Sequence, residues 1–372
     1  MVYIGLFILL AVLAPLDLVN VDQQAAKRKI FYSVILFLIL VSSIRWETGP
    51  DWDSYYNFYT EIDQFVDNPE TNFFEPGFTA INYLFHQMEL PYSVLLTFFA
   101  IVTIGLKSLV FMRHGKMLFI LLFLYFCYYL ADVLSVRQFM AVSINLFSLI
   151  YVERRKIWPF LILTVLSVSI HIASLLFFLT YWLYHARIPN RYMIWGLLAS
   201  LMLGLIDFAT PLVELFAQMT GIDSIFIDKV LRYGEEGLDT SHTNPYVSYL
   251  LGVVKRSFIL PVLFLGRKWI KPEFKSRYQS YLQLLVAGNM IYFVFILTIP
   301  VITRLALPFL YLEIFMLGYL VISAKDWYLK IGMIAALILF GGFRLYMFML
   351  PYMDLYQPFQ TIFTKTLLYN RF

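Results

Sequence analysis

The chain is poor in charged residues and in cysteine. Only 14% of its 372 residues are charged, whereas soluble domains carry about 25%. A packed water-soluble domain therefore does not account for this composition. The single cysteine, Cys127, cannot form an intrachain disulfide, so cysteine usage leaves the redox compartment open.

The sequence also lacks the signatures of the common soluble enzymes. It has no phosphate-binding P-loop, no Gly-x-Gly-x-x-Gly turn, no metal-type cluster of histidine and cysteine, and no Gly-x-Ser-x-Gly elbow. These absences argue against ATP-driven transport by this chain alone. We expect no cofactor, no bound metal and no nucleic-acid partner.

Apolar runs dominate instead. Hydrophobic residues make up 61% of the chain, and the mean hydropathy is +0.74. Apolar runs of roughly 15 to 22 residues recur from end to end, close to the length that crosses a bilayer. The sequence therefore predicts an all-α polytopic integral membrane protein with about 12 transmembrane helices, as a single membrane domain over residues 1–372. The predicted spans are 2–19, 30–44, 92–112, 117–131, 138–152, 157–170, 172–185, 192–207, 247–266, 279–299, 305–322 and 328–349.

The loops between these runs alternate in charge. One set is short and basic, including "AAKRK", "RHGK" and "ERRK", and holds most of the lysines and arginines. Because cytoplasmic loops carry excess Lys and Arg, this set is predicted to face the cytoplasm and both termini the outside. The other set includes two long outer loops, residues 45–91 and 208–246. The first is aromatic and punctuated by prolines, so we expect it to fold as short helices on the membrane surface.

Arginines occur on the outer side, where the topology rule predicts few. They are Arg45, Arg137, Arg232, Arg304 and Arg344. Because the guanidinium fork matches phosphate oxygens, a lipid-linked pyrophosphate at headgroup depth is a natural ligand. Lys255 and Arg256 interrupt a predicted span and are further candidates. The simpler alternative for any single arginine is snorkelling or pairing with an outer carboxylate.

Proton acceptors accompany these arginines. The outer candidates are Asp51, Asp53, Glu75 and His171. A sugar hydroxyl becomes a good nucleophile when such a group takes its proton during attack. An Asp-x-Asp pair is also common in solvated loops, and His171 taken alone reads more readily as a hydrogen-bonded core histidine. Trp52 and Tyr55 could stack on sugar rings, although interfacial aromatic belts explain them equally.

Five short blocks follow one another between residues 40 and 320. They are "TGPDWDSYY" after Arg45, "FFEPGFTAINYLF" with Glu75 and Gly77, "SVRQFMAVSI" with Arg137, Gln138 and Ala141, "SVSIHIASLLFFL" with His171 and Ser174, and "ITRLALPFLYLEIF" with Arg304. In this order they resemble the EpsG family of bacterial polysaccharide polymerases, a branch of the Wzy-type O-antigen and capsule polymerases. The resemblance implies a GT-C-like helical fold in the bacterial inner membrane, with the active site on the periplasmic face.

The resemblance also implies a reaction. Such an enzyme is a glycosyltransferase that moves a growing glycan from undecaprenyl pyrophosphate to the non-reducing end of a new lipid-linked repeat unit. The expected partners are the undecaprenyl-pyrophosphate-linked oligosaccharide, membrane lipid and a chain-length regulator.

We assign hypothetical roles from the outer location and the family blocks together. Arg137 and Arg304 are expected to bind the pyrophosphate, and Arg45 either joins them or holds Asp51 in place. For the base we rank Asp51 first, then His171, then Glu75. The remaining candidates are Lys255 and Arg256 for pyrophosphate and Trp52, Asp53, Tyr55, Gln138 and Arg232 for sugar.

Three other functions share parts of this pattern. A flippase or other transporter of lipid-linked oligosaccharide would favour internal repeats and polar groups near mid-membrane, whereas here the polar groups concentrate at one face. A GT-C glycosyltransferase that uses a polyprenyl-phosphate sugar donor shares an acidic first outer loop. A membrane-bound acyltransferase would place its histidine nearer the membrane interior.

Overall fold

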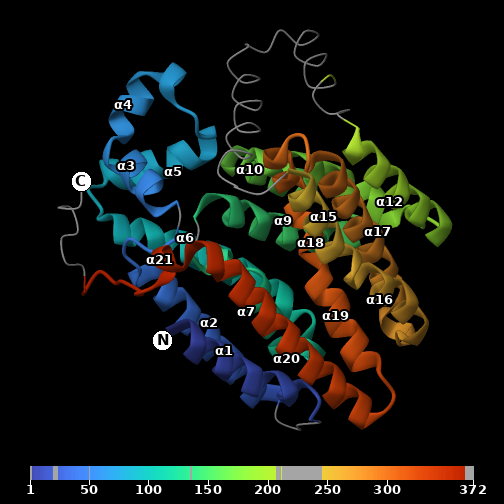
Figure 1. The fold of residues 1–372 in the computed structure, drawn as a ribbon. Coiled ribbons are helices and arrows are strands. Elements are labelled where there is room, and N and C mark those ends of the chain that lie inside the picture. Colours follow the sequence, from blue (N-terminus) through green and yellow to red (C-terminus); the bar gives the residue numbers. More distant parts are fainter. Residues whose placement is uncertain are drawn as a thin grey trace. The chain divides into compact units, whose positions relative to one another are not determined.

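The computed structural model describes residues 2–19, 24–49, 51–134, 136–206, 211 and 245–364. Across these ranges the chain is helical, and its only extended pairing is an isolated bridge between Arg45 and Thr361. The all-α prediction is therefore confirmed for the described residues (Figure 1). Two compact units can be distinguished: unit 1 comprises residues 1–172 and 324–372, and unit 2 comprises residues 173–323. The single membrane domain stays a prediction.

The long helices of unit 1 follow the predicted spans. Together with the short helices that adjoin them, they are α1 (Val2–Leu13), η1 (Ala14–Asp17), α2 (Gln24–Ile44), α6 (Tyr92–Met112), η3 (Gly115–Met117), α7 (Leu118–Tyr128), α8 (Leu130–Leu134), α9 (Arg137–Glu153), α10 (Ile157–Ile170), α20 (Trp327–Met349), η7 (Leu350–Tyr352) and α21 (Met353–Tyr356). Helix α6 lies between α2 and α9, α10 packs on α9, and both α1 and α20 pack on α7.

Unit 2 is built around its longest helix. Its elements are η4 (Ile172–Leu179), α11 (Thr180–His185), α12 (Asn190–Leu205), α15 (Pro245–Ser257), α16 (Ile259–Gly266), η5 (Arg267–Trp269), α17 (Pro272–Phe295), η6 (Pro300–Ala306), α18 (Leu307–Leu310) and α19 (Leu312–Ser323). Helix α17 packs against α11, α12, α18 and α19. The predicted span 247–266 is interrupted after Ser257, because the ring of Pro261 clashes with the carbonyl four residues earlier.

Four helical stretches of the described residues are long and apolar enough to cross a membrane. They are Tyr92–Met112, Tyr249–Trp269, Pro300–Ser323 and Trp327–Tyr356. Four shorter apolar helices accompany them: Val2–Asp17, Gly115–Tyr128, Ile157–Ile170 and Ile172–His185. These lengths and compositions are those of a membrane protein. The number of spans and the likeness to GT-C folds remain predictions.

The predicted outer loop 45–91 folds as short helices, as expected. They are α3 (Trp52–Thr60), α4 (Ile62–Asp67), η2 (Pro69–Thr71) and α5 (Pro76–Gln87). An aromatic core holds them together: the Phe58 ring lies 4.2 Å from Phe74 and 5.7 Å from Phe78 between centroids. This core continues onto buried residues of α6, α9 and α10, so the segment is docked on the long helices of unit 1. Its position on a membrane surface stays a prediction.

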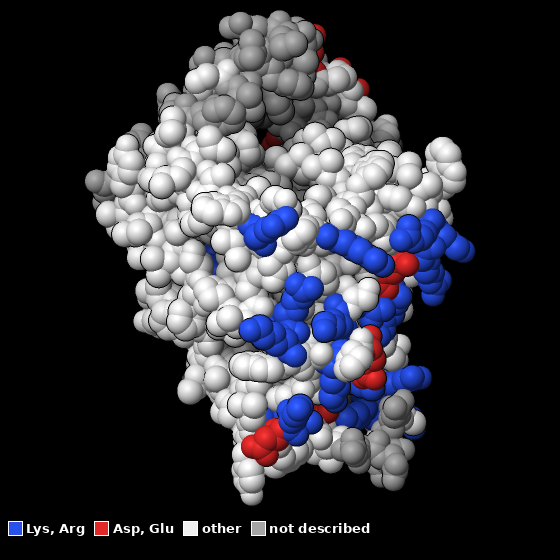
Figure 2. Space-filling view, turned by 90° about the vertical axis from the view of Figure 1, so that its right-hand side faces the viewer, with Lys and Arg blue, Asp and Glu red and all other residues white. Residues whose placement is uncertain are grey.

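Charge is unevenly distributed. On the face drawn in Figure 2, lysines and arginines lie in the middle and lower right, and most of the other described residues there are neither basic nor acidic. Within unit 1, Arg113 after α6 and Glu153 at the end of α9 form an ion pair of 2.8 Å, so the basic loops that follow these two helices lie together. This is the grouping that the topology rule predicts. Which side faces the cytoplasm stays a prediction.

The second predicted outer loop, 208–246, lies almost entirely outside the described residues. Arg232, a candidate for sugar binding, lies outside them as well.

Candidate functional site

Three candidate residues from separate sequence blocks meet in unit 1. Glu75 immediately precedes α5, Arg137 is the first residue of α9, and His171 follows the last residue of α10. Each therefore stands at a helix end, where backbone groups lack helical partners and polar side chains are useful. The helix packing brings together positions that are up to 96 residues apart in sequence (171 − 75).

The Glu75 carboxylate bridges the other two blocks. Its Oε2 accepts a hydrogen bond of 2.9 Å from the Arg137 guanidinium, and its Oε1 accepts one of 2.8 Å from the backbone N–H of Ile172. The two side chains of the ion pair are 16% and 15% exposed. Both carboxylate oxygens are thus engaged, one by a charge and one by the residue next to His171.

Gly77 permits this arrangement. A Cβ at this position would lie 2.8 Å from the backbone oxygen of Ser169, a separation that real Cβ atoms do not show. Helix α5 therefore approaches the end of α10 over a glycine, and this approach brings the Glu75 carboxylate within reach of Ile172. The Glu-x-Gly spacing of the second block has a direct structural reason.

Donors at the start of α9 remain available. The Arg137 guanidinium lies over the rings of Phe74 and Phe78, at 4.7 Å and 5.8 Å from their centroids. Its Nε and the side-chain Nε2 of Gln138 are buried and have no hydrogen-bond partner among the described residues. They add to the unbonded N–H groups at the N-terminus of a helix, where anions bind favourably.

Asp51 and Asp53 are exposed at the start of α3. No hydrogen bond or ion pair joins Arg45 to Asp51 in the described part of the chain. Gly49, between them, has φ +100°, in the left-handed region that favours glycine. His171 is buried, and its backbone N–H donates to Ser167 O at 3.0 Å.

The aromatic candidates of the first block are core residues. Trp52 is 3% exposed and stacks on Tyr56 with ring centroids 4.9 Å apart. Tyr55 is 8% exposed and contacts Phe74 and Phe78. In this structure both rings pack against other rings and present no open face to a sugar.

Unit 2 carries the other basic candidates. Arg304 lies exposed in η6 and makes no ion pair among the described residues. Lys255 and Arg256 lie in the last turn of α15, and the Arg256 guanidinium lies 3.8 Å from the ring centroid of Tyr292. In unit 1, Arg344 makes a similar contact of 3.8 Å with Tyr128.

Sequence reasoning missed one buried ion pair in unit 1. Lys107 of α6 donates to Asp132 Oδ1 at 2.9 Å, to the backbone oxygen of Phe139 at 3.2 Å, and to Ser143 Oγ. Both charged side chains are fully buried. Because Phe139 belongs to the first turn of α9, this network fixes the helix end that carries Arg137. A lone lysine within an apolar run was the signal that could have found it.

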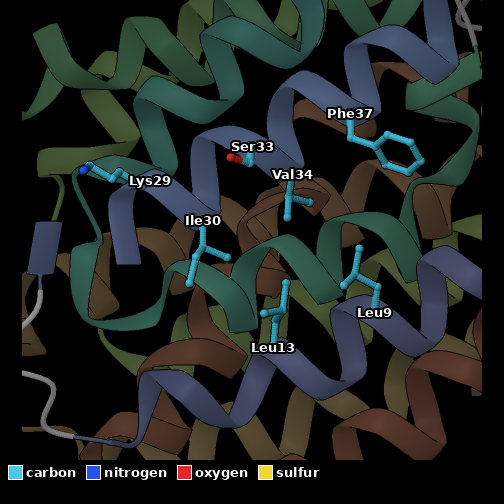
Figure 3. A pocket seen from close by; sticks show the side chains of 7 residues that line it. All are labelled: Leu9, Leu13, Lys29, Ile30, Ser33, Val34 and Phe37. Carbon is cyan, nitrogen blue, oxygen red and sulfur yellow. The ribbon is translucent and has the colours of Figure 1, made fainter. Parts of the chain in front are cut away.

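Two further features concern metal ligands and grooves. No three histidine, cysteine, aspartate or glutamate side chains are grouped to hold a metal ion within the described ranges. The groove between α1 and α2 is lined by Leu9, Leu13, Lys29, Ile30, Ser33, Val34 and Phe37 (Figure 3). Its walls are mostly apolar and include neither a carboxylate nor a histidine, so it suits a lipid chain better than acid–base catalysis.

Comparison with known proteins gave one finding. The model of the EpsG family matches residues 28–361, nearly the whole chain, and includes every block described above. No curated protein and no solved structure matches the chain.

Proposed function

Since this chain belongs to the EpsG family, we propose that it is a Wzy-type polysaccharide polymerase that elongates a glycan on undecaprenyl pyrophosphate. The observation that carries the proposal is the junction of Glu75, Arg137 and the backbone after His171. It unites three family blocks at one place, with the Arg137 guanidinium held by Glu75 and the chain position of His171 next to both. The reaction needs a cationic donor for the leaving group and a proton acceptor for the attacking hydroxyl.

The reaction exchanges one bond at the anomeric carbon of the growing glycan. A hydroxyl of the incoming lipid-linked repeat unit forms the new glycosidic bond, and its proton passes to a base. The bond from the anomeric carbon to the phosphate oxygen breaks, and undecaprenyl pyrophosphate leaves with the electron pair. Fixed donors contribute most where such negative charge develops.

Arg137 is the first candidate to hold the leaving pyrophosphate. Its Nε and the Gln138 amide have no partner among the described residues, and both stand at the N-terminus of α9. Charge-assisted hydrogen bonds to phosphate oxygens are strong, and the helix dipole adds to them. Arg304, Lys255 and Arg256 of unit 2 are proposed as further contacts to the pyrophosphate.

Glu75 is better suited to position Arg137 than to act as the base. Both of its oxygens already accept hydrogen bonds, one from Arg137 and one from the backbone of Ile172, and these bonds hold the carboxylate between the two. Asp51 and His171 therefore remain the candidates for the base. Asp53 stays a proposed sugar contact, because it is exposed one helical position from the buried Trp52.

We place the reaction on the periplasmic face of the bacterial inner membrane. The support is the predicted outer position of all three blocks and the enrichment of the opposite loops in Lys and Arg. The proposed partners are the undecaprenyl-pyrophosphate-linked oligosaccharide, the surrounding lipid and a chain-length regulator.

Deletion of the gene in the source organism, followed by complementation, tests the function. We expect deletion to abolish the glycan ladder on a gel while single repeat units persist, and Arg137→Ala to fail to restore the ladder. Arg154→Ala, in an exposed basic loop, is the matched control and should restore it. Loss of all surface glycan with lipid-linked units trapped in the cytoplasm would instead identify a flippase. Normal chains made by Arg137→Ala would refute its role.

A further inference from the structure

Arg45 is a buried cation without a counter-charge. It follows the last residue of α2 and is 2% exposed. Its side chain makes no ion pair or hydrogen bond with any described residue. Burial lowers the pKa of the guanidinium, and the groups that act against this are all tyrosine hydroxyls. Arginine nevertheless stays protonated in proteins, so an uncompensated positive charge lies inside unit 1.

Tyrosine hydroxyls, which can donate as well as accept hydrogen bonds, surround Arg45. A buried acceptor without a partner among the described residues, Gln360 Oε1, lies in the segment that bonds to Trp46. Tyr92, Tyr3, Tyr356 and Tyr55 lie close enough to interact electrostatically with the guanidinium. The hydroxyls of Tyr3 and Tyr92, like the Arg45 Nε, are buried without a hydrogen-bond partner among the described residues. Unpaired buried donors are rare in native proteins because each costs free energy. A ligand with several acceptor oxygens and negative charge would satisfy all three.

A short C-terminal segment, residues 353–362, covers this cluster. Backbone hydrogen bonds attach it to the chain around Arg45: Gly49 N to Leu355 O at 3.1 Å, Trp46 N to Gln360 O at 3.0 Å, and Ile362 N to Ile44 O at 2.8 Å.

Two side chains anchor the cover. The Tyr356 ring is 1% exposed and meets the ring of Tyr3 edge-on at 6.1 Å, and the Phe359 ring meets the same ring edge-on at 5.9 Å. Neighbouring positions of the segment, such as Gln357 and Pro358, are exposed. Tyr356 is the single buried residue of this segment, and a segment that buries so little belongs to the parts of a protein that open at least cost.

We propose that Arg45, Tyr3 and Tyr92 form an enclosed binding site for a phosphate or diphosphate group, and that residues 353–362 are its lid. The segment opens to admit the anion, and Tyr356 closes over it. As to the ligand met in the cell, the inference rests on the proposed function, which supplies a prenyl diphosphate. The site itself is defined by the buried charge, the unpaired donors and the cover.

Binding of inorganic pyrophosphate to the purified, detergent-solubilised chain tests the site by calorimetry. Arg45→Gln should lower the affinity by about tenfold or more, the contribution of a charge-assisted hydrogen bond. Tyr3→Phe and Tyr92→Phe, which keep the rings, should each weaken binding several-fold. Arg154→Ala is the control and should bind as the native chain does. Farnesyl diphosphate as a second ligand distinguishes the sources: tighter binding indicates a lipid headgroup, equal binding a free diphosphate, and both support the site.

An engineered disulfide that can be formed and then reduced tests the lid in a single protein sample. Ile44 and Ile362 adjoin the antiparallel bridge between Arg45 and Thr361, and the Ile362 N–H donates to Ile44 O at 2.8 Å. Antiparallel residues that are hydrogen-bonded to each other lie about 5.5 Å apart, within the range of a disulfide. In a Cys127→Ser background, oxidised Ile44→Cys/Ile362→Cys should lose the part of pyrophosphate binding that Arg45→Gln removes, and dithiothreitol should restore it. The two single-cysteine variants should not respond to oxidation.

Two results would overturn the inference. Undiminished binding by Arg45→Gln would eliminate the site, and equal binding by the oxidised and reduced double variant would eliminate the lid. Neither measurement requires polymer synthesis. A chain that binds pyrophosphate through Arg45 yet makes no glycan ladder would refute the proposed function and leave the site intact.

Discussion

Arg137 and Arg45 differ in their counter-charges. Arg137 pairs with Glu75, whereas Arg45 pairs with no carboxylate in the described part of unit 1. A paired arginine is held in one direction and keeps its remaining N–H groups for a ligand. A buried unpaired arginine destabilises the empty protein, so the free energy of that burial favours anion binding. Two arginines that look equivalent in sequence thus have different physical roles.

The Glu75 carboxylate provides a test of positioning against proton transfer. In Glu75→Gln the amide oxygen can still accept one hydrogen bond, from Arg137 or from Ile172, so we expect reduced but measurable glycan polymerisation. In Glu75→Ala both bonds are lost and Arg137 is no longer held in place, so we expect activity to fall by about 100-fold or more. Incorporation of labelled repeat units by membranes measures both.

One outcome would contradict a positioning role for Glu75. If Glu75→Gln is as inactive as Glu75→Ala while the protein remains folded in the membrane, Glu75 is the base and not a positioning residue. Glu75 would then rank ahead of Asp51 and His171 as the base, and Asp51→Asn and His171→Ala, assayed alongside, should retain activity.

At the scale of elements, the site depends on how closely two helices approach. Helix α5 lies against the end of α10 over Gly77, and Glu75 is two residues away in the same sequence block. The position of a helix break also determines the site. The interruption between α7 and α9, fixed by Lys107 and Asp132, leaves Arg137 at a helix N-terminus.

Gly77→Ala should separate α5 from α10. The added Cβ meets the Ser169 backbone, and such overpacking typically costs about 1–3 kcal/mol. We expect a lower Tm in detergent and weaker polymerisation. Gly105→Ala is the matched control, because nothing lies within 4 Å of its added Cβ in α6. An unchanged Tm and full activity for Gly77→Ala would show that the close approach is not required.

At the scale of the molecule, the proposal depends on which side of the membrane the outer residues face. In a Cys127→Ser background, Glu61→Cys places a thiol on the exposed start of α4, and Arg154→Cys places one in a basic loop. A membrane-impermeant maleimide added to spheroplasts should label the first and not the second, and permeabilisation should expose both. Labelling of only Arg154→Cys in sealed spheroplasts would invert the topology and rule out a periplasmic active site.

The sequence by itself determined the helical class, the membrane character and the positions of the helices. Apolar runs of bilayer length carry this information locally, and each predicted span overlaps a described helical segment. The ordered blocks also indicated the family, which the match over residues 28–361 confirms. Residues such as Glu75, Arg137 and His171 were identifiable because charged and titratable groups are few in so apolar a chain.

Tertiary structure alone decided which of these residues touch. No local pattern says that Glu75 binds Arg137 and the backbone of Ile172, that Lys107 reaches Asp132, or that Tyr356 lies near Arg45. Nor does a local pattern say that Trp52 and Tyr55 are buried instead of exposed at the surface. Such contacts join segments tens to hundreds of residues apart, and they follow from helix packing and from glycine-sized gaps, which composition and periodicity do not encode.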